Sequence, residues 1–153
     1  MEPGDDLKKR KHPPRIRALV LFSGTGSVER VLHQIFPGAE IISVDCSTAL
    51  APPTHCAEVC EWANKKNVVS YCQYPLHYFD IIWASPPCME YSRAKTCGFR
   101  DLRTADCCVR AALHIIRQLA PVYWFLENPH GSAPFALRCR PFMRELEPYR
   151  RTC

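Results

Sequence analysis

The chain has 153 residues, of which 20 are Lys or Arg and 15 are Asp or Glu, so its formal net charge is +5. This length suits one domain, and the mild basic excess permits a polyanionic partner without requiring one. No apolar run reaches the roughly 18 residues of a membrane span, and no apolar segment follows the charged start at residues 1–11. The composition predicts an intracellular protein with no membrane partner, and it does not distinguish nucleus from cytoplasm.

Ten cysteines would indicate disulfides in a small secreted chain, but without a secretory segment we expect reduced thiols. No Cys-x-x-Cys pair occurs, Cys56 and Cys60 form a lone Cys-x-x-x-Cys, and Cys107 and Cys108 are adjacent on a predicted helix. These spacings do not suit zinc, so no metal cofactor is expected.

The two ends of the chain carry much of the positive charge. Residues 1–15 are charged and contain prolines, with almost nothing to bury, which predicts a disordered basic lead-in before a domain at residues 16–153. Five arginines also lie between Arg138 and Arg151. We interpret the N-terminal cluster as a solvated tail.

Strand-length apolar segments alternate with helical patterns along the domain. Helices are expected at residues 28–36 and 102–119, with a weakly patterned region between 60 and 78. Strands are expected at residues 16–22, 41–44, 55–59, 79–84 and 122–126. Apolar strands that alternate with helices predict an α/β fold with a doubly wound parallel sheet, whose strands are buried on both faces.

The segment that follows the fourth expected strand, Ser85-Pro86-Pro87-Cys88, is the strongest functional signal. Two successive prolines fix φ and remove two backbone donors, so the loop is stiff and extended. It presents Cys88 at the carboxyl end of a strand, where open α/β sheets bind ligands. The alternative interpretation of any one cysteine is a small buried apolar residue.

A glycine turn at residues 23–27 joins the first strand to the first helix and brings backbone N–H groups towards a ligand. The turn is not Gly-x-Gly-x-x-Gly, which favours a smaller adenosine-type cofactor over a dinucleotide. Asp45 ends the second strand about 20 residues on, where an acid accepts ribose hydroxyls. Glu58, at the end of the third strand, is placed to face an adenine amine. The alternative for either acid is a solvated loop residue.

These motifs together resemble the C5-cytosine DNA methyltransferase family, and the longer string around Cys88 is most similar to its compact viral, phage and algal members. The resemblance covers roughly residues 16–129 and rests on the order of Leu21-Phe22-Ser23-Gly24-Thr25-Gly26, Asp45, Ser85-Pro86-Pro87-Cys88 and Glu127-Asn128.

The resemblance implies a Rossmann-like methyltransferase fold with S-adenosylmethionine as its cofactor. The cofactor would lie over Phe22, Ser23, Gly24, Thr25 and Gly26, with Asp45 on its ribose and Glu58 near its adenine. Cys88, presented by Pro86 and Pro87, would attack C6 of a flipped-out cytosine so that C5 accepts the methyl group. Glu127, desolvated at its strand end, would donate a proton to N3, and Asn128 would brace the Pro-Pro-Cys loop. The implied partner is DNA, although the residues do not distinguish DNA from RNA.

The chain also departs from the family. Ser27 stands where a second adjacent glycine is usual, and Pro129 stands where valine is commoner. The family continues with further strands, an arginine-bearing motif, a target-recognition region and a terminal segment, so we expect the domain to be truncated after the fifth strand and nearly inactive alone.

Two alternative functions remain open at this point. One is an amino-methyltransferase that acts on exocyclic nitrogens of bases, whose motif is Ser/Asp/Asn-Pro-Pro-aromatic, whereas here a cysteine follows Pro87. The other is a catalytically inactive remnant that binds nucleic acid.

Overall fold

A computed structural model describes residues 15–67, 70–91 and 97–128 of the chain. Over these ranges five strands, three α-helices and a short 3-10 helix follow one another along the sequence. In chain order they are β1 (Arg17–Leu21), α1 (Ser27–Ile35), β2 (Glu40–Asp45), β3 (His55–Cys56), α2 (Val59–Trp62), the 3-10 helix (Tyr71–Gln73), β4 (Ile81–Ala84), α3 (Leu102–Leu119) and β5 (Tyr123–Leu126).

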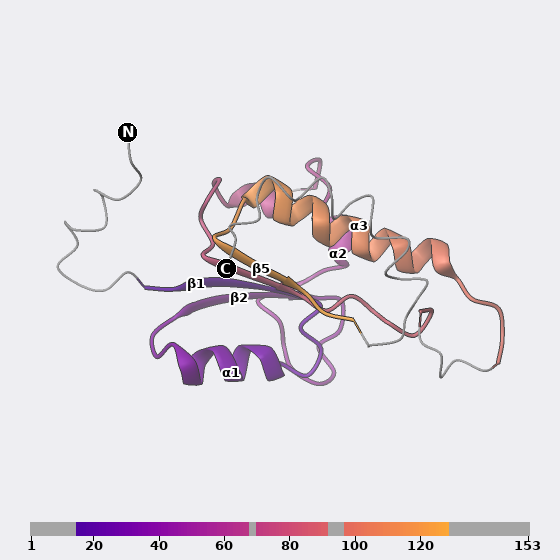
Figure 1. The fold of residues 1–153 in the computed structure, drawn as a ribbon, viewed down its shortest axis with the longest axis horizontal. Coiled ribbons are helices and arrows are strands. Elements are labelled where there is room, and N and C mark those ends of the chain that lie inside the picture. Colours follow the sequence, from indigo (N-terminus) through magenta and orange to yellow (C-terminus); the bar gives the residue numbers. More distant parts are fainter. Residues whose placement is uncertain (1–14, 68–69, 92–96, 129–153) are drawn as a thin grey trace.

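The five strands form one sheet in the order β3-β2-β1-β4-β5, and every neighbouring pair is parallel. The chain therefore moves outwards from β1 to β3, returns past its start, and moves outwards again through β4 to β5. Figure 1 shows α1 on one face of the sheet and α2 with α3 on the other. The predicted α/β fold with a doubly wound parallel sheet is confirmed, and all strand carboxyl ends lie at one edge.

The central strand β1 shows why the sequence pattern was informative. Its last four residues are each 1% exposed or less, because β1 pairs on both sides and is covered on both faces. Leu19 and Leu21 belong to the larger apolar core beneath α2 and α3, whereas Ala18 and Val20 pack with Leu32 of α1. A strand buried on both faces has no polar alternation, and none is present.

Helix α3 has the bounds that its apolar periodicity predicts. The Asp101 carboxylate caps its start by accepting hydrogen bonds from the backbone N–H (3.1 Å) and the hydroxyl (2.6 Å) of Thr104. Its end is set by Ala120 in the left-handed region (φ 42°), whose N–H donates to the Ile116 carbonyl. The helix buries one long stripe against the sheet: Ala105, Asp106, Val109, Ala111, Ala112, Leu113, Ile115, Ile116 and Leu119.

The third strand is shorter than predicted. We expected a strand over residues 55–59, but it ends at Cys56 and α2 begins at Val59. The physical reason is packing, because Val59 and Trp62 are three residues apart on one helical face and are both buried in the core. Glu58 consequently precedes a helix instead of ending a strand.

The last strand is not buried on both faces, so that prediction is wrong. Trp124 and Leu126 pack against the core beneath α3, but Tyr123 and Phe125 on the opposite face are 50% and 47% exposed. The cause is position, since β5 is the outermost strand of the described sheet and α1 packs over β1 and β2.

Several sequence predictions fall outside the described residues. They concern the first 14 residues of the lead-in expected at residues 1–15, the arginine cluster from Arg138 to Arg151, Pro129, and the C-terminal part of the predicted domain. In the ranges that the structure does describe, no helix is both long enough and apolar enough to cross a membrane.

We predict that Ile115→Ala lowers the free energy of unfolding by about 2–5 kcal/mol, because Ile115 is fully buried and its removal leaves a cavity. The matched control is Val31→Ala on α1, where the side chain is 49% exposed and the loss should stay below about 1 kcal/mol. Urea denaturation measures both, and equal losses would contradict the packing described above.

Candidate functional site

The turn between β1 and α1 is built from backbone conformations that favour glycine. Gly24 (φ 54°) and Gly26 (φ 68°) are both in the left-handed region, and Gly26 precedes the first residue of α1. A Cβ added to Gly26 would lie 3.1 Å from the Cβ of Ala51, whereas one added to Gly24 would meet nothing within 4 Å. Gly26 is thus required for packing, while the backbone at Gly24 faces open space that a ligand can occupy.

Phe22 and Ser23 complete this turn. Phe22 is a non-glycine residue at φ 62°, and its N–H donates to the Val44 carbonyl of β2 (2.9 Å). The Ser23 side chain is buried, and its hydroxyl has no hydrogen-bond partner among the described residues. Thr25, in contrast, is exposed. The strained Phe22 backbone is held because β2 satisfies its N–H.

Asp45, at the end of β2, fastens the glycine turn directly. Its Oδ2 accepts from the backbone N–H of Gly24 (3.0 Å), and its Oδ1 accepts from the backbone N–H of Ser47 (2.8 Å). Sequence reasoning placed Asp45 near the turn but did not foresee this bond. Each carboxylate oxygen keeps further acceptor capacity, so the bond is compatible with a ribose hydroxyl on the same carboxylate.

Glu58 lies on the β3 side of the same edge, exposed and immediately before α2. The thiol of Cys46, which follows Asp45, is exposed. Partial burial first, and then the neighbouring Glu58 side chain, raise the pKa of this thiol above its usual value.

The Pro-Pro-Cys loop leaves β4 in a defined direction. The Ser85 N–H donates to the Leu21 carbonyl (3.2 Å), and the Ser85 hydroxyl accepts from the indole N–H of Trp83 (2.8 Å). Pro86 is buried and Pro87 is exposed. Cys88 follows as a free, half-buried thiol at the carboxyl end of β4, where the sequence predicted it.

Glu127 and Asn128 follow β5 beside this loop. The Asn128 side-chain amide donates to the Pro86 carbonyl at 3.5 Å, a long bond, and its Oδ1 is buried with no partner in the described part of the chain. The Glu127 N–H donates to the Ala84 carbonyl (2.9 Å), but its side chain is exposed. The expected desolvation of Glu127 is therefore wrong for this structure, because no described element packs beyond β5.

Strand order brings these residues to one edge in two groups. The glycine turn, Asp45 and Glu58 lie at the ends of β1 and β2 and beyond β3, whereas Cys88 and Glu127 lie beyond β4 and β5. The two groups meet where β1 and β4 are neighbours, which is also where the strand order reverses. Ligand sites of open α/β sheets occupy this position.

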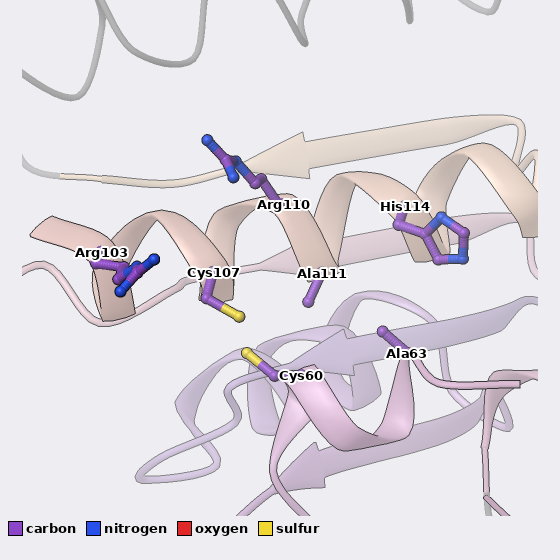
Figure 2. A pocket seen from close by; sticks show the side chains of 7 residues that line it. All are labelled: Cys60, Ala63, Arg103, Cys107, Arg110, Ala111 and His114. Carbon is purple, nitrogen blue, oxygen red and sulfur yellow. The ribbon is translucent and has the colours of Figure 1, made fainter. Parts of the chain in front are cut away.

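The one cavity described for these residues lies elsewhere, and none of the predicted site residues lines it. It has a volume of about 460 Å³ and lies between α2 and α3. In Figure 2, Cys60 of α2 and Cys107 of α3 point toward each other across it. Its lining consists of Cys60, Ala63, Arg103, Cys107, Arg110, Ala111 and His114.

Two half-buried neutral thiols lie near this cavity, and they form no metal site with the other described residues. Burial raises the pKa of the Cys60 and Cys108 thiols, whose sulfur atoms are 3.9 Å apart. Across the described ranges, no group of three or more His, Cys, Asp or Glu side chains is arranged to hold a metal ion.

Comparison with known proteins gives the same assignment as the motifs. No protein-family model matches the chain. Over 126 residues, however, the chain is 32% identical to a protein of Frog virus 3 (isolate Goorha) that is named "Probable DNA (cytosine-5)-methyltransferase". The match covers 74% of this chain. The chain therefore resembles the C5-cytosine DNA methyltransferase family by overall sequence as well as by its motifs. It spans about half of its viral relative, since the match covers 54% of that protein.

Sequence reasoning missed two residues near Cys88. Tyr91, three residues after Cys88, is 1% exposed, and its hydroxyl donates to Asp106 of α3, which is itself 8% exposed. A signal was present, because Asp106 interrupts the apolar stripe between Ala105 and Val109 and is one of the few buried polar side chains in the described residues. A charged residue on the buried face of a helix implies a polar partner.

We predict that alanine costs more at Gly26 than at Gly24. Alanine in the left-handed region costs roughly 1–2 kcal/mol at either position, but at Gly26 the added Cβ also meets the side chain of Ala51 at 3.1 Å. Urea unfolding of Gly24→Ala and Gly26→Ala measures the difference. An equal or larger loss for Gly24→Ala would show that the Gly26–Ala51 approach does not constrain the turn.

Proposed function

We propose that this chain is the cofactor-binding and nucleophile-bearing part of an enzyme that transfers a methyl group from S-adenosylmethionine to C5 of cytosine in DNA. The observation that carries the proposal is the shared edge of the sheet. The glycine turn, Asp45, the Pro-Pro-Cys loop and Glu127-Asn128 lie at the carboxyl ends of four different strands, and those strands all end at this edge. The name of the viral relative, with its DNA substrate and cytosine C5 target, supports the same reaction.

The glycine turn fits an adenosine-type cofactor on two grounds. The backbone at Gly24 faces open space, because no atom lies within 4 Å of the place where its Cβ would stand. The buried Ser23 hydroxyl next to it is left without a described partner. We assign Phe22, Ser23, Gly24, Thr25 and Gly26 to holding S-adenosylmethionine, Asp45 to its ribose and Glu58 to its adenine. When bound, this cofactor supplies a methyl group that is activated by its attachment to a sulfonium.

Cys88 supplies the nucleophile. Once the thiol proton has passed to solvent, the sulfur donates an electron pair to C6 of the target cytosine, a bond forms between sulfur and C6, and the C5–C6 double bond is lost. Electron density then accumulates at C5, which makes C5 the atom that accepts a methyl group. Loss of the C5 proton to a base afterwards returns the S–C6 electron pair to sulfur, restores the ring and frees Cys88.

Glu127 limits the charge that builds up on the base. Protonation of N3 by its carboxyl group would make the ring a better electrophile while Cys88 attacks C6. Glu127 is exposed in the chain alone, so the bound base itself would have to exclude water from this carboxyl group. Asn128, through its contact with the Pro86 carbonyl, would hold the loop that carries Cys88.

We predict that calorimetry detects weak binding of S-adenosylmethionine or its demethylated product, and that Asp45→Ala abolishes it, because this carboxylate also fastens the Gly24 N–H. Asp80→Ala is the matched control. Asp80 also accepts a backbone N–H, from Arg17 at the start of β1, so it lies at the opposite edge of the sheet. Both variants should lose stability, but only Asp45→Ala should lose affinity. Unchanged affinity in Asp45→Ala would refute the cofactor assignment.

We also predict that a DNA oligonucleotide containing 5-fluorocytosine, with S-adenosylmethionine, forms a covalent adduct through Cys88, because fluorine at C5 blocks the final elimination. Cys88→Ser should abolish the adduct in a mass spectrum of the intact protein. Cys97→Ser and Cys107→Ser are the controls, since both thiols are exposed and both variants should keep the adduct. An adduct mapped to Cys97 or Cys107 would refute the role of Cys88.

A further inference from the structure

The segment that follows Cys88 is fastened to α3 by a buried hydrogen bond. The Tyr91 hydroxyl donates to Oδ1 of Asp106 over 2.6 Å, and the two residues are 1% and 8% exposed. A phenol that donates to a carboxylate makes a short, charge-assisted bond, which is stronger than a bond between neutral groups. The mechanism proposed above gives neither residue a role.

A second contact fastens the neighbouring residue to the start of the same helix. Oε2 of Glu90 accepts from the backbone N–H of Asp101 (2.7 Å), and the Glu90 carbonyl accepts from the guanidinium of Arg100 (2.8 Å). Asp101 in turn caps α3 through Thr104. Glu90 and Tyr91 are therefore both tied to the N-terminal part of α3.

Cys88 lies between these contacts and the start of the loop, which hydrogen bonds of Ser85 hold in place. On one side Ser85 is bonded to Leu21 and Trp83, and two prolines follow it. On the other side only Met89, which is 71% exposed, separates Cys88 from the two tied residues. The Cys88 carbonyl also accepts from the Tyr91 N–H (3.0 Å), which closes a turn. A displacement of Tyr91 is thus passed on to Cys88 over three residues.

The chemistry of the Tyr91–Asp106 pair indicates that the pair determines where the Cys88 turn lies more than it adds to the stability of the fold. Burial of a carboxylate costs free energy that an apolar residue on the inner face of α3 would not cost. A hydrogen bond has a preferred length and direction, whereas apolar packing tolerates sliding. The pair therefore defines where the end of the Cys88 turn lies relative to α3.

We propose that Tyr91 and Asp106 are positioning residues that hold the Cys88 thiol in its half-buried place at the end of β4. The proposal rests on the function proposed above, in which Cys88 is the nucleophile. The pair acts on Cys88 through the backbone of residues 88–91 and touches no reacting atom.

The test is the rate at which iodoacetamide alkylates each thiol, followed by peptide mass spectrometry. Tyr91→Phe removes one hydroxyl and keeps the buried ring. It should raise the alkylation rate of Cys88 at least about threefold, as expected for losing one hydrogen bond that restrains the segment. The exposed thiols of Cys56 and Cys72 serve as internal references and should keep their rates.

Two further comparisons separate positioning from general stability. Tyr74→Phe is the matched control, because the hydroxyl of Tyr74 also makes one side-chain hydrogen bond, to Nε2 of His55 (3.0 Å), away from Cys88. It should lower the melting temperature and leave the Cys88 rate unchanged. Asp106→Asn keeps an acceptor oxygen for Tyr91 but loses the charge, so it should raise the Cys88 rate less than Asp106→Ala, which should raise it at least as much as Tyr91→Phe.

An unchanged Cys88 rate in Tyr91→Phe and in Asp106→Ala would overturn the proposal, as would an equal acceleration of all thiols, which reports global loosening. The outcome is independent of methyl transfer. If Cys88 forms no adduct with 5-fluorocytosine DNA but its alkylation responds selectively to these variants, the proposed function fails while the positioning contact stands. The reverse result removes the positioning role and leaves Cys88 as the nucleophile.

Discussion

The bond from the Gly24 N–H to the Asp45 carboxylate is the interaction on which the geometry of the proposed cofactor site depends. It joins the end of β2 to the turn between β1 and α1, and so fixes two parts of the chain that sequence motifs place 21 residues apart. Of the other left-handed residues of the turn, Phe22 donates to the Val44 carbonyl, and Gly26 donates to Ser23 and accepts from Arg30, so the Asp45 carboxylate is the side chain that holds Gly24. If Asp45 also binds the ribose as proposed, cofactor binding and folding of this edge depend on the same carboxylate.

The proposed catalytic residues are joined to the proposed cofactor site through the backbone of the sheet. The N–H of Ser85, where the Pro-Pro-Cys loop begins, donates to the carbonyl of Leu21, the last residue of β1 before the glycine turn. This contact follows from the parallel register of β1 and β4, in which the last residues of the two strands, Leu21 and Ala84, are paired. A methyl donor over the glycine turn and a base at Cys88 would consequently be held at neighbouring strand ends by a rigid element, which is how proximity contributes to catalysis.

Sequence reasoning succeeded where one interaction type determines the outcome. Apolar runs located β1 and β4, the 3.6-residue period located α3, and prolines and glycines located both loops. It failed where tertiary packing competes. The apolar pattern predicts Val59 in a strand, but Val59 and Trp62 are buried together on one face of a helix. The same pattern predicts that Tyr123 and Phe125 are buried, but in the structure both side chains are about half exposed. The Tyr91–Asp106 bond joins residues 15 apart in sequence, and no local pattern specifies such a pair.

The half-exposed aromatic face of β5 also has a thermodynamic consequence. Trp83 stacks on Phe125 with ring centroids 5.3 Å apart, yet Phe125 and Tyr123 keep about half of their surface in water. Unfolding the chain exposes less new apolar surface at these residues than it would in a sheet covered on both faces. Because the heat capacity of unfolding rises with the apolar area that becomes exposed, this edge contributes little to it. The stability of the chain should accordingly vary less steeply with temperature than its aromatic content suggests.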